Sequence, residues 1–147
     1  MNQYNEMKAR HQEEVNNFPM KFAFGQEQLA AALAEWGLTA EDMDKVTSIY
    51  GCGDILLKKD VPAWEAMCKR HKQEMDDAIA ADKTGDGFLF DMFDAELSNH
   101  EYGYTRDPYD ALGALGLSYI DVYKDARLIH GFEKACKNQA EWYDKNR

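Results

Sequence analysis

The chain has 147 residues, of which 45% are hydrophobic and 30% charged, and its formal net charge is −10. A chain of this length and apolar content can bury a core, which argues against wholesale disorder, and the negative charge disfavours direct binding to nucleic-acid phosphates. No apolar run is long enough for a membrane span or a signal peptide, so we expect a cytoplasmic protein with one globular domain over residues 1–147.

From the N-terminus, the spacing of apolar residues alternates between helical and extended patterns. A helix is predicted over residues 2–17, a short extended run over 20–24, and a second helix over 26–36 that ends before a glycine. Residues 46–58 contain two apolar runs around a Gly-Cys-Gly turn, a pattern typical of a β-hairpin. A lone hairpin is marginally stable in water, so we expect helices to cover it.

The rest of the chain predicts helices separated by short turns. Residues 60–82 show the longest helical pattern, which begins with an aspartate at the expected N-cap. Further helices are predicted over residues 88–99, 107–115 and 125–143, and residues 118–121 resemble a capping pair. The sequence therefore predicts a mostly α (α+β) fold, with about six helices packed around one short β-hairpin.

Two of these helices carry clear apolar faces that should lie in the core. On the helix over 60–82, the expected core residues are Trp64, Met67, Cys68, His71, Met75, Ala78 and Ile79. On the last helix, they are Leu128, Phe132, Ala135, Cys136 and Trp142. A buried Cys68 would be unreactive, although Cys–His catalysis stays open because such residues meet in space and not in sequence.

Acidic residues gather between residues 74 and 101. This segment holds nine acidic residues and one base, a net charge of −8, whereas the other 119 residues together carry −2. Such a run is typical of the solvated outer face of helices, and the alternative is an acidic surface that docks a basic protein. On the second interpretation, the partner-binding residues are Asp76, Asp77, Asp82, Asp86, Asp91, Asp94, Glu96 and Glu101.

A metal site is the other candidate in this segment. Glu96 and His100 lie four residues apart on one helical turn, and Glu101 follows, so these three side chains are the predicted metal ligands. The structural alternative is a histidine that interacts favourably with the helix C-terminus. The stretch 82–93 also resembles half of an EF-hand loop, but Phe93 stands where a bidentate glutamate is needed. Its structural alternative is a glycine-rich turn in which Asp86 caps the next helix.

Several motifs together resemble a known family. They are Phe18-Pro19, Phe22-Ala23-Phe24, the turn over 49–53, Asp82 with Gly85-Asp86-Gly87-Phe88, Met92-Phe93, Glu96-Leu97 with Asn99-His100-Glu101-Tyr102, and Ala114-Leu115-Gly116 with Arg127-Leu128. In these the chain is similar to a family of small uncharacterised proteins, a domain of unknown function, from phages and mobile elements of gut Firmicutes. The resemblance implies a bacterial or phage cytoplasm and no particular reaction.

These observations lead to two functional predictions. The first is a non-enzymatic acidic binding protein that docks a basic protein surface. By analogy with other small mobile-element proteins, the expected partner is a host defence nuclease. The chain would then act as an inhibitor of the anti-CRISPR or antirestriction type. The alternative is a metal-binding protein or metal-dependent hydrolase centred on Glu96, His100 and Glu101. No catalytic residue, cofactor, nucleic-acid partner or membrane partner is predicted, and the oligomeric state stays open.

Overall fold

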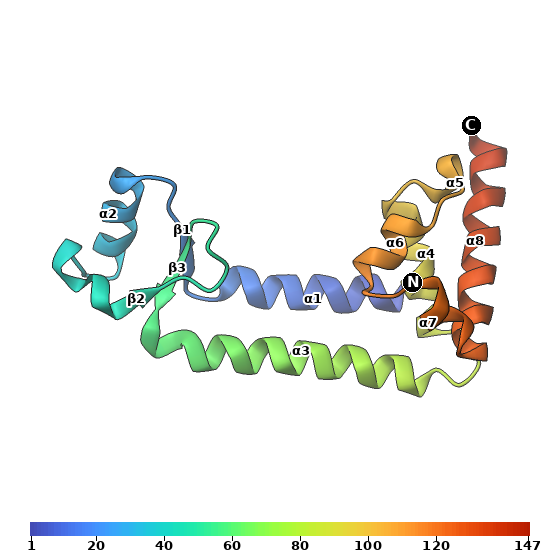
Figure 1. Ribbon diagram of the computed structural model, residues 1–147, viewed down its shortest axis with the longest axis horizontal. Helices are drawn as coiled ribbons and strands as arrows, with labels where there is room; N and C mark the ends of the chain where they lie inside the picture. The colour runs from blue at the N-terminus through green and yellow to red at the C-terminus, as the bar shows by residue number, and fades with distance from the viewer. The chain divides into compact units, whose positions relative to one another are not determined.

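The computed structural model describes residues 1–147, which form two compact units. Unit 1 comprises residues 1–12 and 73–147, and unit 2 comprises residues 13–72. Two helices, α1 (Gln3–Asn17) and α3 (Val61–Ala81), contribute residues to both units (Figure 1). Each unit has its own hydrophobic core, and a single domain over the whole chain stays a prediction.

Unit 2 contains a small antiparallel sheet of three strands, β1 (Met20–Phe22), β2 (Val46–Thr47) and β3 (Asp54–Leu57), in the order β1-β3-β2 (Figure 1). Strands β2 and β3 form the predicted hairpin, in which Val46 lies opposite Leu57. The extended run after α1 supplies the third strand, which pairs Met20 with Leu56. Helix α2 (Gln26–Glu35) and the 3-10 helices η1 (Ala40–Lys45) and η2 (Lys58–Asp60) complete the unit.

The hairpin loop is organised by one buried carboxylate. Asp54, the first residue of β3, is only 1% exposed. Its carboxylate accepts hydrogen bonds from the backbone N–H groups of Ile49 (2.8 Å), Tyr50 (3.0 Å) and Cys52 (3.2 Å) and from the hydroxyl of Ser48 (2.9 Å). Burial alone would raise the pKa of Asp54, but these donors outweigh it and hold the pKa well below its usual range.

The core of unit 2 joins the sheet to the two long helices. Leu56 of β3 packs with Trp64 and Met67 of α3, and Val15 and Phe18 from the end of α1 pack against this cluster. The rings of Phe18 and Trp64 meet edge to face, with centroids 5.1 Å apart. Because β3 is the central strand of the sheet, its buried side chain Leu56 lies where the sheet packs against the helices.

Unit 1 is entirely helical. Its helices besides the ends of α1 and α3 are α4 (Phe88–Asn99), α5 (Tyr102–Thr105), α6 (Tyr109–Ala114), α7 (Tyr119–Tyr123) and α8 (Ala126–Asn146). Helix α4 lies beside α8, where Phe93 meets Phe132 edge to face at 5.5 Å (Figure 1). Gly131 permits this approach, because a Cβ there would lie 2.8 Å from the carbonyl oxygen of Gly85.

The predicted fold class is confirmed: the chain is mostly helical and contains a small antiparallel sheet. The expected capping box at residues 118–121 is present, and Asp125 caps α8. Eight α-helices form instead of about six, since short helices at α5 and α7 occupy segments between the predicted ones. None of the helices combines the length and apolar character needed to cross a membrane.

Two expected core residues are exposed. Cys68 lies at the surface of α3, because Trp64 and Met67 alone face the core of unit 2 along that stretch of the helix. Trp142 is 60% exposed near the end of α8, where the four-residue helix α5 is the neighbouring element. In both α3 and α8, the helical periodicity predicts the correct buried face, but that face is narrower in the structure than the pattern suggests.

Candidate functional site

The acidic segment over residues 74–101, which belongs to unit 1, is largely engaged in internal contacts. Asp82 follows α3, and its two carboxylate oxygens accept hydrogen bonds from the backbone N–H groups of Thr84, Gly85, Gly87 and Leu89 at 2.8–3.2 Å. Burial alone would raise the pKa of Asp82, but these donors lower it. Asp82 therefore closes the turn before α4, the role that the sequence assigned to Asp86; the N-cap position itself is Gly87.

Asp86 instead connects the turn to α8. Its Oδ1 lies 2.7 Å from Nε2 of His130 and 3.0 Å from the ammonium of Lys134. The hydrogen bonds from His130 and then from Lys134 lower the pKa of Asp86. All three side chains are about half exposed, so solvent screens the pair and its contribution to stability is small.

Two further carboxylates of α4 bind neighbouring helices. Asp91 accepts a hydrogen bond of 2.8 Å from the backbone N–H of Gln3, at the first turn of α1. Asp94 accepts hydrogen bonds from the side-chain amides of Asn138 (2.8 Å) and Gln139 (2.9 Å) on α8. Both aspartates thus use their oxygen atoms to hold helices of unit 1 together.

Glu96 is the one buried carboxylate of α4, with 3% of its surface exposed. It accepts a hydrogen bond of 2.9 Å from the hydroxyl of Tyr4, and the ammonium of Lys8 lies 3.6 Å away. Burial raises the pKa of Tyr4, and the hydrogen bond to Glu96 raises it further. Glu96 is therefore an internal partner of α1 and is not available to a docking protein.

The predicted docking residues consequently separate into two groups. Asp82, Asp86, Asp91, Asp94 and Glu96 serve contacts within unit 1, whereas Asp77 and Glu101 present exposed carboxylates that hold no second helix, and Asp76 is also exposed. The expectation of one continuous exposed acidic surface therefore needs correction. The reason is that acidic side chains next to helix ends accept hydrogen bonds from N–H and amide donors within the fold, so their oxygen atoms are not left to solvent alone.

The structure does not gather the predicted metal ligands into a metal-binding group. No cluster of three or more His, Cys, Asp or Glu side chains is placed to hold an ion. Nδ1 of His100 lies 2.9 Å from the backbone carbonyl of Glu96 and 3.8 Å from Oε2 of the same residue, whose Oε1 accepts the hydrogen bond from Tyr4. Glu101 follows the helix in a different backbone conformation, with φ of 57°.

An open aromatic cleft lies next to Glu101. It has a volume of about 370 Å³ and is lined by Ser98, Glu101, Gly103, Tyr104, Gln139, Trp142 and Tyr143. Tyr104 is 72% exposed and Trp142 60%, and the rings of Tyr104 and Tyr143 are 6.0 Å apart. We call this site the aromatic cleft. Glu101 is a predicted site residue, whereas Trp142 was expected in the core.

Backbone features of α5 place these side chains. Glu101 and Arg106, on either side of α5, are the two residues other than glycine with positive φ, at 57° and 59°. Each costs of order 1 kcal/mol, so the surrounding packing must impose it. Gly103 lets α5 approach α8, since a Cβ there would lie 2.8 Å from Cβ of Tyr143. Arg106 also pairs with Asp144 at 2.8 Å.

The chemistry of the aromatic cleft favours cations. Rings of tyrosine and tryptophan attract a lysine or arginine head group through their π faces, and a carboxylate adds direct charge attraction. No lysine or arginine lines the cleft, and the amide of Gln139 is held by Asp94. The carboxylate of Glu101 is thus the only formal charge in the lining.

The half-buried thiol of Cys136 offers no comparable chemistry. Burial raises its pKa, although a hydrogen bond with Tyr102 partly opposes the shift. Burial also raises the pKa of Tyr102, to about 12. Because the thiolate is the nucleophilic form, a thiol with a raised pKa is poorly suited to attack a substrate near neutral pH.

Comparison with known proteins identifies the family of the chain but does not assign a reaction to it. No curated protein and no solved structure matches it. The model described as "Family of unknown function (DUF7659)" matches residues 3–138, a range that covers both units. The chain therefore belongs to this family of unknown function.

Proposed function

We propose that this protein is a non-enzymatic binding protein that docks a basic protein surface by capturing a lysine or arginine side chain in the aromatic cleft. One observation carries the proposal. Three aromatic rings and the carboxylate of Glu101 line a single open cleft that contains no basic residue. This combination recognises an organic cation and would repel an anionic ligand.

The charge of unit 1 supports the same class of partner. Unit 1 carries 17 acidic and 10 basic residues, a net charge of −7. Such a field accelerates encounter with a basic surface and loses its effect at high salt. The cleft itself supplies local affinity, because a cation–π contact is worth about 0.5–1 kcal/mol when exposed and about 2 kcal/mol when desolvated.

A narrower form of the proposal is an inhibitor of a host defence nuclease, acting in the cytoplasm of a bacterium that hosts a phage or mobile element. It is supported by charge: nucleases present basic grooves to nucleic acid, and an acidic protein competes for them. Its test is inhibition of DNA cleavage by restriction and CRISPR nucleases, with the Trp142→Ala variant as the matched control. Inhibition that this variant retains would contradict the role of the cleft.

The binding proposal is tested directly by titration with a lysine-rich peptide, followed by NMR of the tryptophan indole N–H groups. The chain has three tryptophans, and the Trp142→Phe variant assigns the signal of the cleft. We expect the Trp142 indole signal to shift, and we expect Trp142→Ala or Glu101→Gln to weaken binding roughly tenfold. Asp110→Asn, an exposed acid on α6 outside the lining and outside the predicted docking residues, is the control and should bind normally.

Two results would contradict the binding proposal. One is a Trp142 signal that stays fixed while the peptide binds elsewhere, and the other is equal affinity for a glutamine-substituted peptide. The alternative prediction, a metal-binding protein or metal-dependent hydrolase at Glu96, His100 and Glu101, is checked on the same samples by metal analysis after purification without chelator. Stoichiometric metal that Glu96→Gln removes would favour that alternative.

A further inference from the structure

Unit 2 contains a second cavity whose charge is opposite to that of the aromatic cleft. Trp36, Leu38 and Leu57 form its apolar walls, and its volume is about 520 Å³. This size lies within the range of roughly 300–1,000 Å³ that is usual for small-molecule sites. We call it the lysine cavity, because Lys45, Lys58 and Lys59 also line it.

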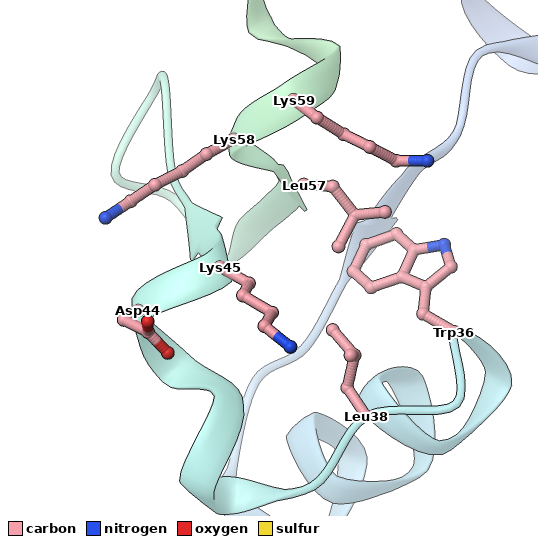
Figure 2. Close-up of a pocket in the computed structure, with 7 residues that line it drawn as sticks. All are labelled: Trp36, Leu38, Asp44, Lys45, Leu57, Lys58 and Lys59. Atoms are coloured by element: carbon pink, nitrogen blue, oxygen red, sulfur yellow. The ribbon is translucent and has the colours of Figure 1, made fainter.

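The lysines are not arranged symmetrically around the lysine cavity. Figure 2 shows the ammonium of Lys45 directed toward Trp36 and Leu38, and the side chain of Lys59 extending above the indole, whereas Lys58 points away from it. Lys45 and Lys59 therefore approach one apolar space from two sides. A ligand in this space would meet the indole of Trp36 with its body and the ammonium of Lys45 with its charged end, while Lys59 contributes positive charge from the other side.

Charge distribution makes this concentration of lysines unusual for the chain. Unit 2 has seven Lys and Arg residues against ten acidic ones, and three of the seven line this single cavity. One acid, Asp44, is also in the lining, and Asp42 pairs with Lys45 at 3.2 Å. Lys59 has no ion pair, so the cavity keeps an uncompensated positive charge within an acidic protein.

The apolar character continues beyond Leu38. That residue also lines a neighbouring cavity of about 670 Å³, whose walls include Leu29 and Met43 from α2 and η1. Leu38 thus belongs to the apolar walls of both spaces. This apolar surface beside the lysines favours an amphipathic molecule over a simple inorganic anion.

We propose that the lysine cavity binds a small amphipathic organic anion. Its carboxylate or phosphate lies near the ammonium of Lys45, its flat apolar body lies against Trp36 and Leu57, and Lys59 adds positive charge from the other side of the indole. The site is separate from the aromatic cleft, belongs to the other unit, and selects ligands of the opposite charge. The chain would therefore carry a small-molecule site in addition to its protein-docking site.

The test uses matched probes and the intact chain. Naphthalene-2-carboxylate and 1-naphthyl phosphate supply the two head groups, and naphthalene-2-carboxamide is the neutral control. Binding is followed by the Trp36 indole N–H signal, assigned with Trp36→Phe, and by calorimetry. We expect the carboxylate or the phosphate to bind about three to five times more tightly than the amide, since the contact with Lys45 is exposed and Lys59 adds a weaker attraction. Lys45→Gln should remove this preference, and Lys59→Gln should reduce it.

The control variant is Lys69→Gln, because Lys69 is an exposed lysine of α3 in the same unit and lies outside the lining. It should bind the probes as the parent chain does. Equal affinity for the charged and neutral probes would overturn the proposal, as would loss of binding in Lys69→Gln alone. A shift of the Trp142 signal without one at Trp36 would also overturn it, and this readout separates it from failure of the cation-binding proposal.

Discussion

The buried carboxylate of Asp54 provides the sharpest test of how this fold is held together. Replacing Asp54 by alanine removes an acceptor that the hairpin loop surrounds with three backbone N–H groups and the hydroxyl of Ser48. Replacing it by asparagine keeps the volume but leaves one acceptor oxygen and turns an NH₂ group toward the donors. We expect both variants to destabilise unit 2.

The magnitude follows from the contacts. A hydrogen bond to a charged group contributes about 1.5–3 kcal/mol, and a buried donor left without a partner costs about 1–3 kcal/mol. Ile49 and Tyr50 lie at the surface, so water can reach part of the loop and recover some of this free energy. We therefore expect Asp54→Ala to lower the free energy of unfolding of unit 2 by about 3 kcal/mol.

The assay is urea unfolding monitored by the fluorescence of Trp64, which lies in the core of unit 2 with its ring 6.0 Å from that of Tyr50. A background of Trp36→Phe and Trp142→Phe leaves Trp64 as the only tryptophan. Asp44→Asn, an exposed acid outside the loop, is the control and should change stability by less than about 0.5 kcal/mol. A loss below about 1 kcal/mol for both Asp54 variants would refute the reasoning.

The pKa shift of Asp54 adds a pH dependence with a defined sign. Because the folded pKa lies below its ordinary value, the carboxylate stabilises the fold fully above the unfolded pKa of about 3.9. That contribution is lost as pH falls below about 4 toward the folded pKa. The stability difference between the parent chain and Asp54→Ala should shrink over this range, and a difference that grows on acidification would contradict the assignment.

Three further predictions concern unit 1. Gly103→Ala should lower stability by about 1–3 kcal/mol and disrupt the aromatic cleft, whereas Gly113→Ala, where a Cβ meets nothing within 4 Å, should be neutral or stabilising in thermal unfolding. Glu101→Gly should raise stability by about 1 kcal/mol by relieving the positive φ, yet abolish binding of the lysine-rich peptide in the NMR titration. Tyr4→Phe leaves the carboxylate of Glu96 without its hydroxyl donor and should cost about 1–3 kcal/mol in urea unfolding.

Much of the local structure was predictable from residue patterns. The helix over residues 88–99 has the predicted bounds, and the capping box at 118–121 and the hairpin within 46–58 form as expected. These features depend on periodicity, on caps within three residues and on turn glycines, all of which are local. The number of short helices was underestimated, because α5 and α7 contain only four and five residues and show too few repeats of a helical pattern.

The candidate sites were less predictable, because they depend on side chains that meet from distant parts of the chain. The charge pattern predicts an acidic segment, but it does not distinguish exposed from buried carboxylates. Glu101 lines the aromatic cleft, whereas Glu96 is buried and accepts a hydrogen bond from Tyr4. Neither Trp36 nor Lys59 was a candidate, since nothing in their local sequence places them in one cavity. A strongly charged segment identifies carboxylates but does not show which of them lack internal donors.

Residue patterns along the chain are enough to predict the helical class, the hairpin, the caps and the net charge of −10. Which carboxylates hold helices together, and which remain exposed, depends on how the helices pack in three dimensions. The partners of Glu96 and Asp86 lie 92 and 44 residues away along the chain, a separation that no local pattern spans. The physical reason is that a carboxylate is stabilised by any N–H, amide or ammonium donor that folding brings next to it, however distant that donor is in the sequence. Residue type and spacing describe only the neighbours of the carboxylate along the chain.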